Sequence, residues 1–480
     1  MPGRLQPTVY ERRRPAPGLV QESLRTTRSA VFWLEDQERD AATTDYPALT
    51  ADTVADLVVV GGGYCGLWTA IIAKRRDPSL RVVLLEAQTI GWAASGRNGG
   101  FCEASLTHGE ENGRSRWPGE YDELARLGEE NLAGLEADVA ALGIDCQLER
   151  TGSLSVAVEE HQVPWVSADP STHLDATAVR AEIDSPIFLA GAWEREGCVL
   201  VHPGRLAAGL ARAAAELGVE IHEHSAVEAL DGAAGLAGQQ VQTVRTARAT
   251  VRAKRVALAT NVFRPLLRRA RPLTVPVYDY VLMTDPLSTE QMAAIGWHHR
   301  QGLTDLANQF HYARLTADNR VLYGGYDAVY PRGGRLRASH EERPASYERL
   351  ASHFLTTFPQ LEGVRFSHRW SGPIDTCTRF AAFHGSARRG RVAYAAGFTG
   401  LGVGATRFAA QVMVDRLTDQ DTPRTRLEMV RKLPLPFPPE PLAGVGIALT
   451  KWSLDRADHQ QGQRNSFLRV LDRLGLGFDS

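Results

Sequence analysis

"ADLVVVGGGYCGLW" (residues 55–68) decides the fold, because a run of branched apolar residues leads directly into a cluster of glycines. Gly61, Gly63 and Gly66 match the pattern G-x-G-x-x-G. In that pattern the glycines permit a tight turn, close approach of the backbone to a pyrophosphate, and close packing of helix on strand. The stretch predicts an adenine-dinucleotide site. On its own, the stretch does not distinguish three alternatives. These are a nicotinamide cofactor that binds and leaves, a flavin that stays bound, and a glycine-rich turn without a ligand.

The residues around this loop favour a bound dinucleotide. We expect a strand over 56–60 and a helix over 64–76, which Asp77-Pro78 would end. The next strand, 81–86, closes with Glu86. An acidic side chain at this place accepts hydrogen bonds from ribose hydroxyls and repels a 2′-phosphate, so NADP is disfavoured.

Two further glycine-rich stretches offer sites for the rest of a larger ligand. "GWAASGRNGG" (91–100) combines bare backbone with the donors Ser95, Arg97 and Asn98. "AAGFTGLGVGATR" (395–407) runs a strand into glycines that open a helix, whose N–H groups would face the electron-rich edge of a flavin. The alternatives are an ordinary surface turn and a second tight strand–helix turn.

Composition limits the possible partners. The chain has 480 residues, of which 43% are hydrophobic and 23% charged, with a net charge near −2. This balance gives no general attraction to nucleic acid or anionic lipid. No stretch approaches the ~18 apolar residues that a membrane span needs, and residues 1–20 lack the apolar segment of a signal peptide. We therefore expect neither a nucleic-acid nor a membrane partner.

Cysteine usage points to a reducing compartment. The five cysteines are widely spaced and form no C-x-x-C pair. We expect no disulfide framework and no metal site, and we place the protein in the cytoplasm.

The order of segments predicts an α/β plus α+β protein, with a Rossmann-like domain built from discontinuous pieces and an inserted antiparallel sheet. The expected divisions are an N-terminal arm (1–54) packed on the surface, a nucleotide-binding domain (55–110, 196–270 and 386–430), a substrate domain (111–195 and 271–385), and a proline-rich connector with a helical tail (431–480).

Taken together, these stretches resemble the D-amino-acid-oxidase-type superfamily of FAD-dependent oxidoreductases, in the branch of gamma-glutamylputrescine oxidoreductase and glycine or sarcosine oxidase. The resemblance covers roughly residues 55–417. It rests on motifs in the expected order: "DLVVVGGGYCGL" with Glu86, "GWAASGRNGG", "VHPGRLAAGLARAAAELGV", "ALATN", "HYARLTADNRVLYGG" and "GFTGLGV".

The resemblance implies an FAD domain covered by an antiparallel sheet, with FAD held noncovalently. Cys102 and His108 raise covalent attachment as an alternative, although neither lies in a matching motif. Val227 would flank the adenine, and residues 400–403 would lie at the pyrimidine edge of the flavin. The implied cofactor-binding residues are Gly61, Gly63, Gly66, Glu86, Ser95, Arg97, Asn98, Gly99, Val227, Gly397, Thr399, Gly400, Leu401, Gly402 and Val403.

The resemblance also implies a reaction, the oxidation of a C–N bond in a small amine or amino acid. The late segment reads "GFTGLGV" and lacks the glycine–aspartate motif of flavin hydroxylases. A monooxygenase that uses NAD(P)H is therefore a weaker alternative, and a non-catalytic protein with the FAD fold is a third. No lysine occurs between Lys254 and Lys432 to serve as the oxygen-activating lysine of some relatives. The electron acceptor is thus O2 or another compound.

Candidate catalytic residues lie mainly in the predicted sheet. Arg314, in "HYARLT", matches the arginine that grips a substrate carboxylate in amino-acid-oxidising relatives; the alternative is an ion pair with Asp318 or Asp327. His108 follows the glycine-rich stretch and is placed near the flavin. The side chains that could wall the site, or merely pack within the sheet, are Tyr278, Tyr280, His311, Tyr312 and Trp370.

Overall fold

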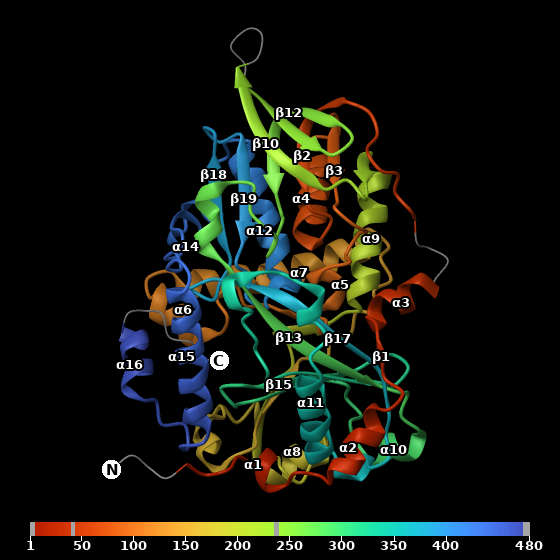
Figure 1. The fold of residues 1–480 in the computed structure, drawn as a ribbon, viewed down its shortest axis with the longest axis vertical. Coiled ribbons are helices and arrows are strands. Elements are labelled where there is room, and N and C mark those ends of the chain that lie inside the picture. Colours follow the sequence, from red (N-terminus) through yellow and green to blue (C-terminus); the bar gives the residue numbers. More distant parts are fainter. Residues whose placement is uncertain (1–4, 40–43, 235–239, 474–480) are drawn as a thin grey trace.

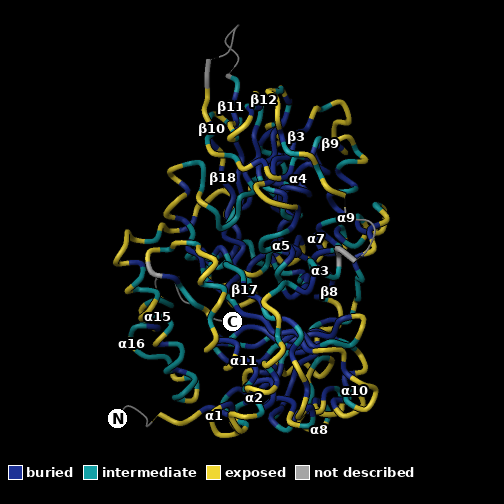
Figure 2. Tube along the Cα trace, turned by 45° about the vertical axis from the view of Figure 1, so that its right-hand side comes forward, coloured by how far each residue is buried: buried dark blue, intermediate teal, exposed yellow. Residues whose placement is uncertain are grey.

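The computed structural model describes residues 5–39, 44–234 and 240–473. The molecule has two halves, each built around a large sheet (Figure 1). Buried positions concentrate in the two sheets and the helices between them, while exposed positions lie in loops and outer helices (Figure 2). The two halves meet at the mid-height of the molecule (Figure 1).

The upper half is an eight-stranded sheet whose centre is parallel. The order is β10-β11-β12-β2-β3-β9, and β19 pairs with β12 and β18. These strands are β2 (Thr53–Val60), β3 (Val82–Leu85), β9 (Val219–His222), β10 (Val227–Ala234), β11 (Gln240–Thr246), β12 (Thr250–Leu258), β18 (Phe383–Ala387) and β19 (Val392–Ala396). The helices α4 (Tyr64–Arg76), α9 (Pro203–Glu216) and α12 (Gly402–Leu417) pack with it. This arrangement confirms the expected Rossmann-like half assembled from separated segments.

The lower half is a nine-stranded sheet that is mostly antiparallel. Its order is β1-β17-β13-β16-β15-β14-β5-β7-β6, and only the pairs β1–β17 and β14–β5 within it are parallel. The strands are β1 (Arg28–Ser29), β5 (Ser153–Ala157), β6 (His173–Leu174), β7 (Ala190–Glu194), β13 (Val275–Thr284), β14 (Gly302–Asp305), β15 (His311–Leu315), β16 (Val321–Gly325) and β17 (Phe366–Thr376).

The remaining elements connect or cover these sheets. They are α1 (Val9–Arg12), α2 (Pro17–Leu24), α3 (Phe32–Arg39), α5 (Ala94–Arg97), β4 (Phe101–Glu103), α6 (Glu110–Arg116), α7 (Tyr121–Ala141), α8 (Ala176–Glu182), β8 (Cys198–Leu200), α10 (Thr289–Ile295), α11 (Pro344–Thr357), α13 (Pro423–Arg426), α14 (Glu428–Arg431), α15 (Leu442–Asp458) and α16 (Ser466–Arg473), with short 3-10 turns between them.

The nine-stranded sheet has two faces with different neighbours, and strand alternation decides which side chains reach each one. Tyr278 and Tyr280 of β13 point into the core that includes α11, which we term the α11 face. Val281 and Met283 pack with Trp370 on the other side. We term this side the α5 face, because α5 and its neighbours in the upper half lie against it.

Two segments make contacts that the sequence did not predict. The arm over 1–54, expected on the surface, contributes β1 to the edge of the nine-stranded sheet, where it pairs with β17. Its Trp33 is only 1% exposed, because the indole packs in the core of the α5 face. Helix α7, expected within the substrate domain, packs its Leu124 and Leu135 into the core of the upper half. Its apolar stripe therefore covers the nucleotide-binding half.

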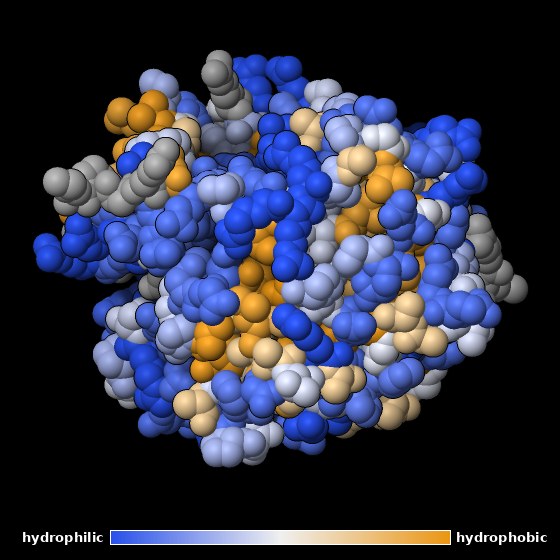
Figure 3. All heavy atoms as spheres, turned by 90° about the horizontal axis from the view of Figure 1, so that it is seen from below, coloured by the Kyte–Doolittle hydropathy of each residue, from blue (hydrophilic) through white to orange (hydrophobic). Residues whose placement is uncertain are grey.

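The face seen from below carries both polar and apolar side chains. Hydrophilic side chains surround several apolar patches there (Figure 3). None of the helices in the described ranges combines the length and the apolar composition needed to cross a membrane. The cysteines are all buried and reduced.

Candidate cofactor and substrate site

The loop between β2 and α4 is built on two contacts that only glycine allows. A Cβ atom at Gly66 would lie 1.9 Å from the carbonyl oxygen of Gly61. Gly61 itself has φ +112°, and a Cβ there would lie 2.4 Å from the carbonyl oxygen of Ala259. Helix α4 begins at Tyr64, as the sequence predicts, and its N-cap Gly63 offers no capping side chain. The helix N-terminus therefore opens onto the loop, which is the arrangement that binds a pyrophosphate.

Ser95 and Glu86 flank this loop. The Ser95 hydroxyl accepts a hydrogen bond from the Tyr64 N–H at 3.0 Å, and it lies 2.8 Å from where a Cβ at Gly63 would stand. The buried Glu86 carboxylate accepts hydrogen bonds from the Gly62 N–H at 2.6 Å and from the Trp92 indole at 2.9 Å. Glu86, which the sequence predicts to bind the ribose, lies beside the glycine loop. Its bonds here are to the protein itself.

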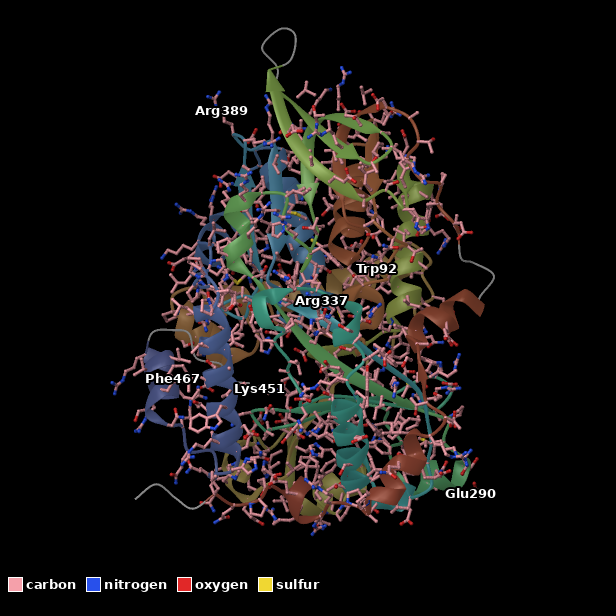
Figure 4. All side chains as sticks on the ribbon, viewed as in Figure 1. Trp92, Glu290, Arg337, Arg389, Lys451 and Phe467 are labelled. Atoms are coloured by element: carbon pink, nitrogen blue, oxygen red, sulfur yellow. The ribbon has the colours of Figure 1, made fainter. Side chains whose placement is uncertain are left out.

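The segment 91–100 joins the two halves. The Arg97 guanidinium donates to Glu341 at 2.6 Å and to the Ser371 carbonyl of β17 at 2.8 Å. In return, the Trp370 indole donates to the Arg97 carbonyl at 2.8 Å. Figure 4 shows Trp92 at the mid-height of the molecule, where the two halves meet. Arg97 was expected to line the ligand. It instead pairs with Glu341 and bonds to β17, which docks residues 91–100, here termed the cofactor segment, onto the lower sheet.

Asn98 and its neighbours shape the end of this segment. The Asn98 amide donates to the Ser95 carbonyl at 2.9 Å, and its side-chain oxygen accepts the Gly100 N–H at 2.8 Å. Its backbone carbonyl accepts the Trp33 indole N–H at 2.9 Å. The turn that presents Gly99 to the lower sheet is therefore held from both the cofactor segment and the N-terminal arm.

The late glycine segment forms a left-handed turn before α12. Gly397, Thr399 and Gly400 all have positive φ, at +75°, +50° and +96°. The buried carboxylate of Asp375 accepts the Gly397 N–H at 2.5 Å and holds this turn against β17. Burial raises the pKa of Asp375 to about 7. A Cβ at Gly400 would meet no atom within 4 Å, so the approach to the helix is open.

The other predicted cofactor residues fall around these segments. Leu401 is the N-cap of α12 and has no side-chain cap, Gly402 begins the helix, and Val403 is buried behind it. Val227 begins β10 at the edge strand of the upper sheet and is half-buried.

His108 lies beside the late glycine turn and Cys102 lies behind it. The His108 ring is linked by a hydrogen bond to the Thr399 backbone, and burial lowers its pKa to about 4. Cys102 is fully buried in β4, and its Sγ lies 3.4 Å from where a Cβ at Gly404 would stand. Burial raises the pKa of the Cys102 thiol, which opposes formation of a reactive thiolate. The approach of His108 to the flavin stays a prediction.

These observations fit FAD. The α4 and α12 N-termini both lack a capping side chain, and both follow glycines. Helix N-termini of this kind stabilise negative charge, one on a pyrophosphate and the other at an electron-rich ring edge. The steric cradle at Gly61 and Gly66 places the first of them directly at the end of β2.

Tyr312, with Trp370 and Arg314, is one of the lower-sheet side chains that meet the cofactor segment. Its ring lies 2.9 Å from where a Cβ at Gly99 would stand. The same ring passes over Gly324 of the neighbouring strand β16, where a Cβ would lie 2.6 Å from the phenol oxygen. Because Gly324 has no side chain, the Tyr312 hydroxyl spans β16 and donates to Asp279 of β13 at 2.6 Å.

Asp279 is an ionisable group on the α5 face that sequence reasoning missed. Burial raises its pKa to about 6, although hydrogen bonds from Tyr312 and from the backbone of Tyr280 and Gly325 lower it. A signal was present, because "VYDYVL" places an acid between two tyrosines in the middle of a buried strand. With Tyr278 and Tyr280 on one face, alternation places Asp279 on the other.

Arg314 has neither of the partners expected from sequence. It is 2% exposed and donates to the backbone carbonyls of Val201 at 2.6 Å and Leu315 at 3.2 Å. Its guanidinium carbon lies 5.6 Å from the centre of the Trp33 ring. Burial lowers its pKa to about 10. The side chain is packed beneath the Gly100 turn, where a Cβ would lie 2.4 Å from its Nη1.

The remaining candidates divide between the two faces. Trp370 lies on the α5 face, beside Arg97. Tyr278 lies on the α11 face, and its hydroxyl donates to the Arg337 carbonyl. His311 also points to that face, where it bonds to Asp305 at 2.6 Å and to His353 at 2.9 Å. The sheet therefore separates Tyr278 and His311 from the cofactor segment.

We predict that Gly66→Ala abolishes retention of FAD, because the new Cβ would collide with the Gly61 backbone. The matched control is Gly119→Ala, where a Cβ meets nothing within 4 Å. Flavin absorbance of the purified variants, after equilibration with FAD, measures the effect. Equal flavin content in Gly66→Ala and in the control would contradict the role given to this contact.

The chain is similar to known proteins in both sequence and fold. Residues 56–416 match the family described as "DAO: FAD dependent oxidoreductase". The chain is 31% identical to gamma-glutamylputrescine oxidoreductase of Escherichia coli over 418 residues, covering 82% of this chain and 90% of that protein. It is 26% identical to a probable oxidoreductase, OrdL, of Haemophilus influenzae over 412 residues, covering 82% and 88%. The crystal structure of glycine oxidase from Geobacillus kaustophilus superposes with a TM-score of 0.62 at 21% identity, covering 77% of this chain and 96% of that one. The chain belongs to the DAO family of FAD-dependent oxidoreductases.

Proposed function

We propose that this FAD-dependent oxidoreductase oxidises the C–N bond of a small amine or amino acid. One observation carries the proposal. The half-buried carboxylate of Asp279 lies on the sheet face that meets the cofactor segment, and Tyr312 links the two. The name of the Escherichia coli relative, gamma-glutamylputrescine oxidoreductase, supports a substrate of amine type.

The carboxylate meets a specific chemical need. FAD, when bound, accepts the two electrons that leave the substrate as its C–N single bond becomes an imine, which water then hydrolyses to a carbonyl product and ammonia or an amine. An ammonium group has no free lone pair to form that double bond, so it must first lose a proton. Asp279, with a pKa of about 6, is ionised at neutral pH and able to take that proton.

Neighbouring side chains give this carboxylate its position. The Tyr312 hydroxyl holds one oxygen of Asp279 at 2.6 Å, and the Tyr312 ring packs edge-on against Phe101 with the ring centres 6.0 Å apart. The two aromatic rings form an apolar wall beside Gly99. The bonds between Arg97 and β17 fix the wall relative to the cofactor segment. The chain thus supplies orientation and a proton acceptor.

The electron acceptor is O2 or another compound. The ammonium groups of all four lysines have partners elsewhere in the described chain: Lys74 at backbone carbonyls, Lys254 with Asp56, Lys432 with Glu428, and Lys451 with Asp327.

We predict that primary amines or amino acids bleach the visible flavin band when mixed anaerobically with the FAD-loaded protein. Tert-butylamine, which has no hydrogen on the α carbon, is the matched control and should not bleach the band. A panel of amines and amino acids, followed by rapid-mixing absorbance, makes the measurement. If NADH or NADPH bleaches the band and the panel does not, the monooxygenase alternative replaces this proposal.

We predict that kcat/KM for an oxidised amine falls as the pH drops through about 6, because protonated Asp279 cannot accept a proton. Asp279→Asn should lower kcat/KM about 100-fold or more. It should also abolish the fall of kcat/KM at low pH, which is the acidic limb of the pH profile. Tyr312→Phe deletes a hydrogen bond that lowers the pKa of Asp279, so the limb should move to higher pH by roughly one unit.

The control for this pH series is Asp318→Asn, which alters a carboxylate in the exposed turn between β15 and β16 of the same half. It should leave the acidic limb in place. An unchanged limb in Asp279→Asn, or a shift to lower pH in Tyr312→Phe, would remove Asp279 from the proton transfer.

A further inference from the structure

Helix α15 carries an apolar stripe that is exposed to solvent. The stripe consists of Leu442, Val445, Leu449 and Trp452. Their spacing of three, four and three residues places all four on one side of the helix, in the a/d pattern of helices that pair with one another. Most of the large apolar side chains that are exposed in the described ranges lie in this part of the chain, between residues 433 and 470.

The contacts that α15 makes with its own molecule are mainly polar. The helix lies beside the lower half, at the outer edge of the molecule (Figure 1). Its Lys451 ammonium donates to Asp327 at 2.9 Å, and its Asp458 carboxylate accepts the Asn308 amide at 2.7 Å. The buried side chains of the helix are small, namely Ala443, Ser453 and Ala457. A surface helix ordinarily buries its large apolar side chains, so the stripe on α15 indicates a partner outside this copy of the chain.

The charges around the stripe do not suit an anionic membrane. Helices that lie on such membranes carry basic side chains beside their apolar face. No lysine or arginine occurs from Leu433 to Thr450, and Lys451 is paired with Asp327. The two ends of the stripe instead have opposite charges. Glu440 is exposed just before the helix, and the Arg456 guanidinium carbon lies 5.5 Å from the centre of the Trp452 ring.

A second copy of the chain complements both the spacing and the charges. In a two-fold antiparallel pair of α15 helices, Leu442 would face Trp452 of the second copy and Val445 would face Leu449. Position 456 would then face position 438, which places Arg456 within reach of Glu440 at both ends of the pair. A parallel pair would bring like charges together at each end.

We propose that α15 forms a dimer interface, in which the apolar stripes of two copies pack antiparallel and Arg456 of each copy pairs with Glu440 of the other. The stripe is short, about 15 Å from Leu442 to Trp452. We therefore expect a weak dimer, with a dissociation constant in the micromolar range.

Sedimentation equilibrium of the full-length, FAD-loaded protein over a range of concentrations measures this dimer. Val445→Asp should weaken it about tenfold or more, because the substitution buries an unpaired charge at the centre of the stripe. The matched control is Val54→Asp in β2. Val54 is 58% exposed and Val445 is 63% exposed, so the same substitution is made at a similarly exposed valine in the other half. The control should dimerise as the parent does.

An exchange of charges tests the antiparallel arrangement. Positions 440 and 456 of one copy are about 24 Å apart along the helix, so they cannot pair within that copy. Glu440→Arg and Arg456→Glu should each weaken self-association severalfold, because like charges then meet at both ends. An equal mixture of these two variants should dimerise more tightly than either alone, since both contacts then join opposite charges. Flavin content confirms that each variant is folded and loaded.

Three results would overturn the proposal. They are a parent protein that stays monomeric at all concentrations, a dimer that Val445→Asp leaves unchanged, and a mixture of the two charge variants that associates no more tightly than each variant alone. Vesicles that contain phosphatidylglycerol test the other occupant. If the parent binds them, stays monomeric, and loses this binding in Val445→Asp, the stripe binds lipid and the dimer proposal is wrong.

Discussion

The contact between Gly66 and the Gly61 carbonyl is the constraint on which the rest of the structure depends. At 1.9 Å from a hypothetical Cβ, no other residue is tolerated without moving α4 away from β2. The contact fixes the uncapped N-terminus of α4 at the end of the strand, next to Glu86 and Ser95. Since Ser95 lies in the segment 91–100, the same contact positions the chain that crosses to the lower sheet.

A few hydrogen bonds connect the cofactor segment to the nine-stranded sheet and to the N-terminal arm. Arg97 donates to β17, Trp370 donates back to Arg97, and Trp33 of the N-terminal arm donates to Asn98. These bonds hold the α5 face of the nine-stranded sheet in one position against the cofactor segment. Tyr312 and Asp279 are consequently placed by the glycine loop, although they lie more than 200 residues away along the chain.

The parts of the site that could be predicted are those set by local backbone geometry. Gly61, Gly66 and Gly397 can be recognised in the sequence because their backbone conformations or close contacts exclude any side chain, so each position requires glycine. The sequence did not reveal Asp279, and it suggested other partners for Arg314. The contacts of both side chains depend on the strand register and on the sheet face to which each side chain points. Tyr312 reaches Asp279 only because Gly324 intervenes between their strands, a relation that appears once β13, β16 and β15 are paired.

We propose that a substrate amine binds beside Asp279, between the lower sheet and the cofactor segment. A crystal structure of the FAD-loaded protein with tert-butylamine would locate the amine. We expect its nitrogen within hydrogen-bond distance of a carboxylate oxygen of Asp279, at about 2.7–3.2 Å. A nitrogen bound elsewhere, with Asp279 contacting only Tyr312 and the backbone, would contradict it.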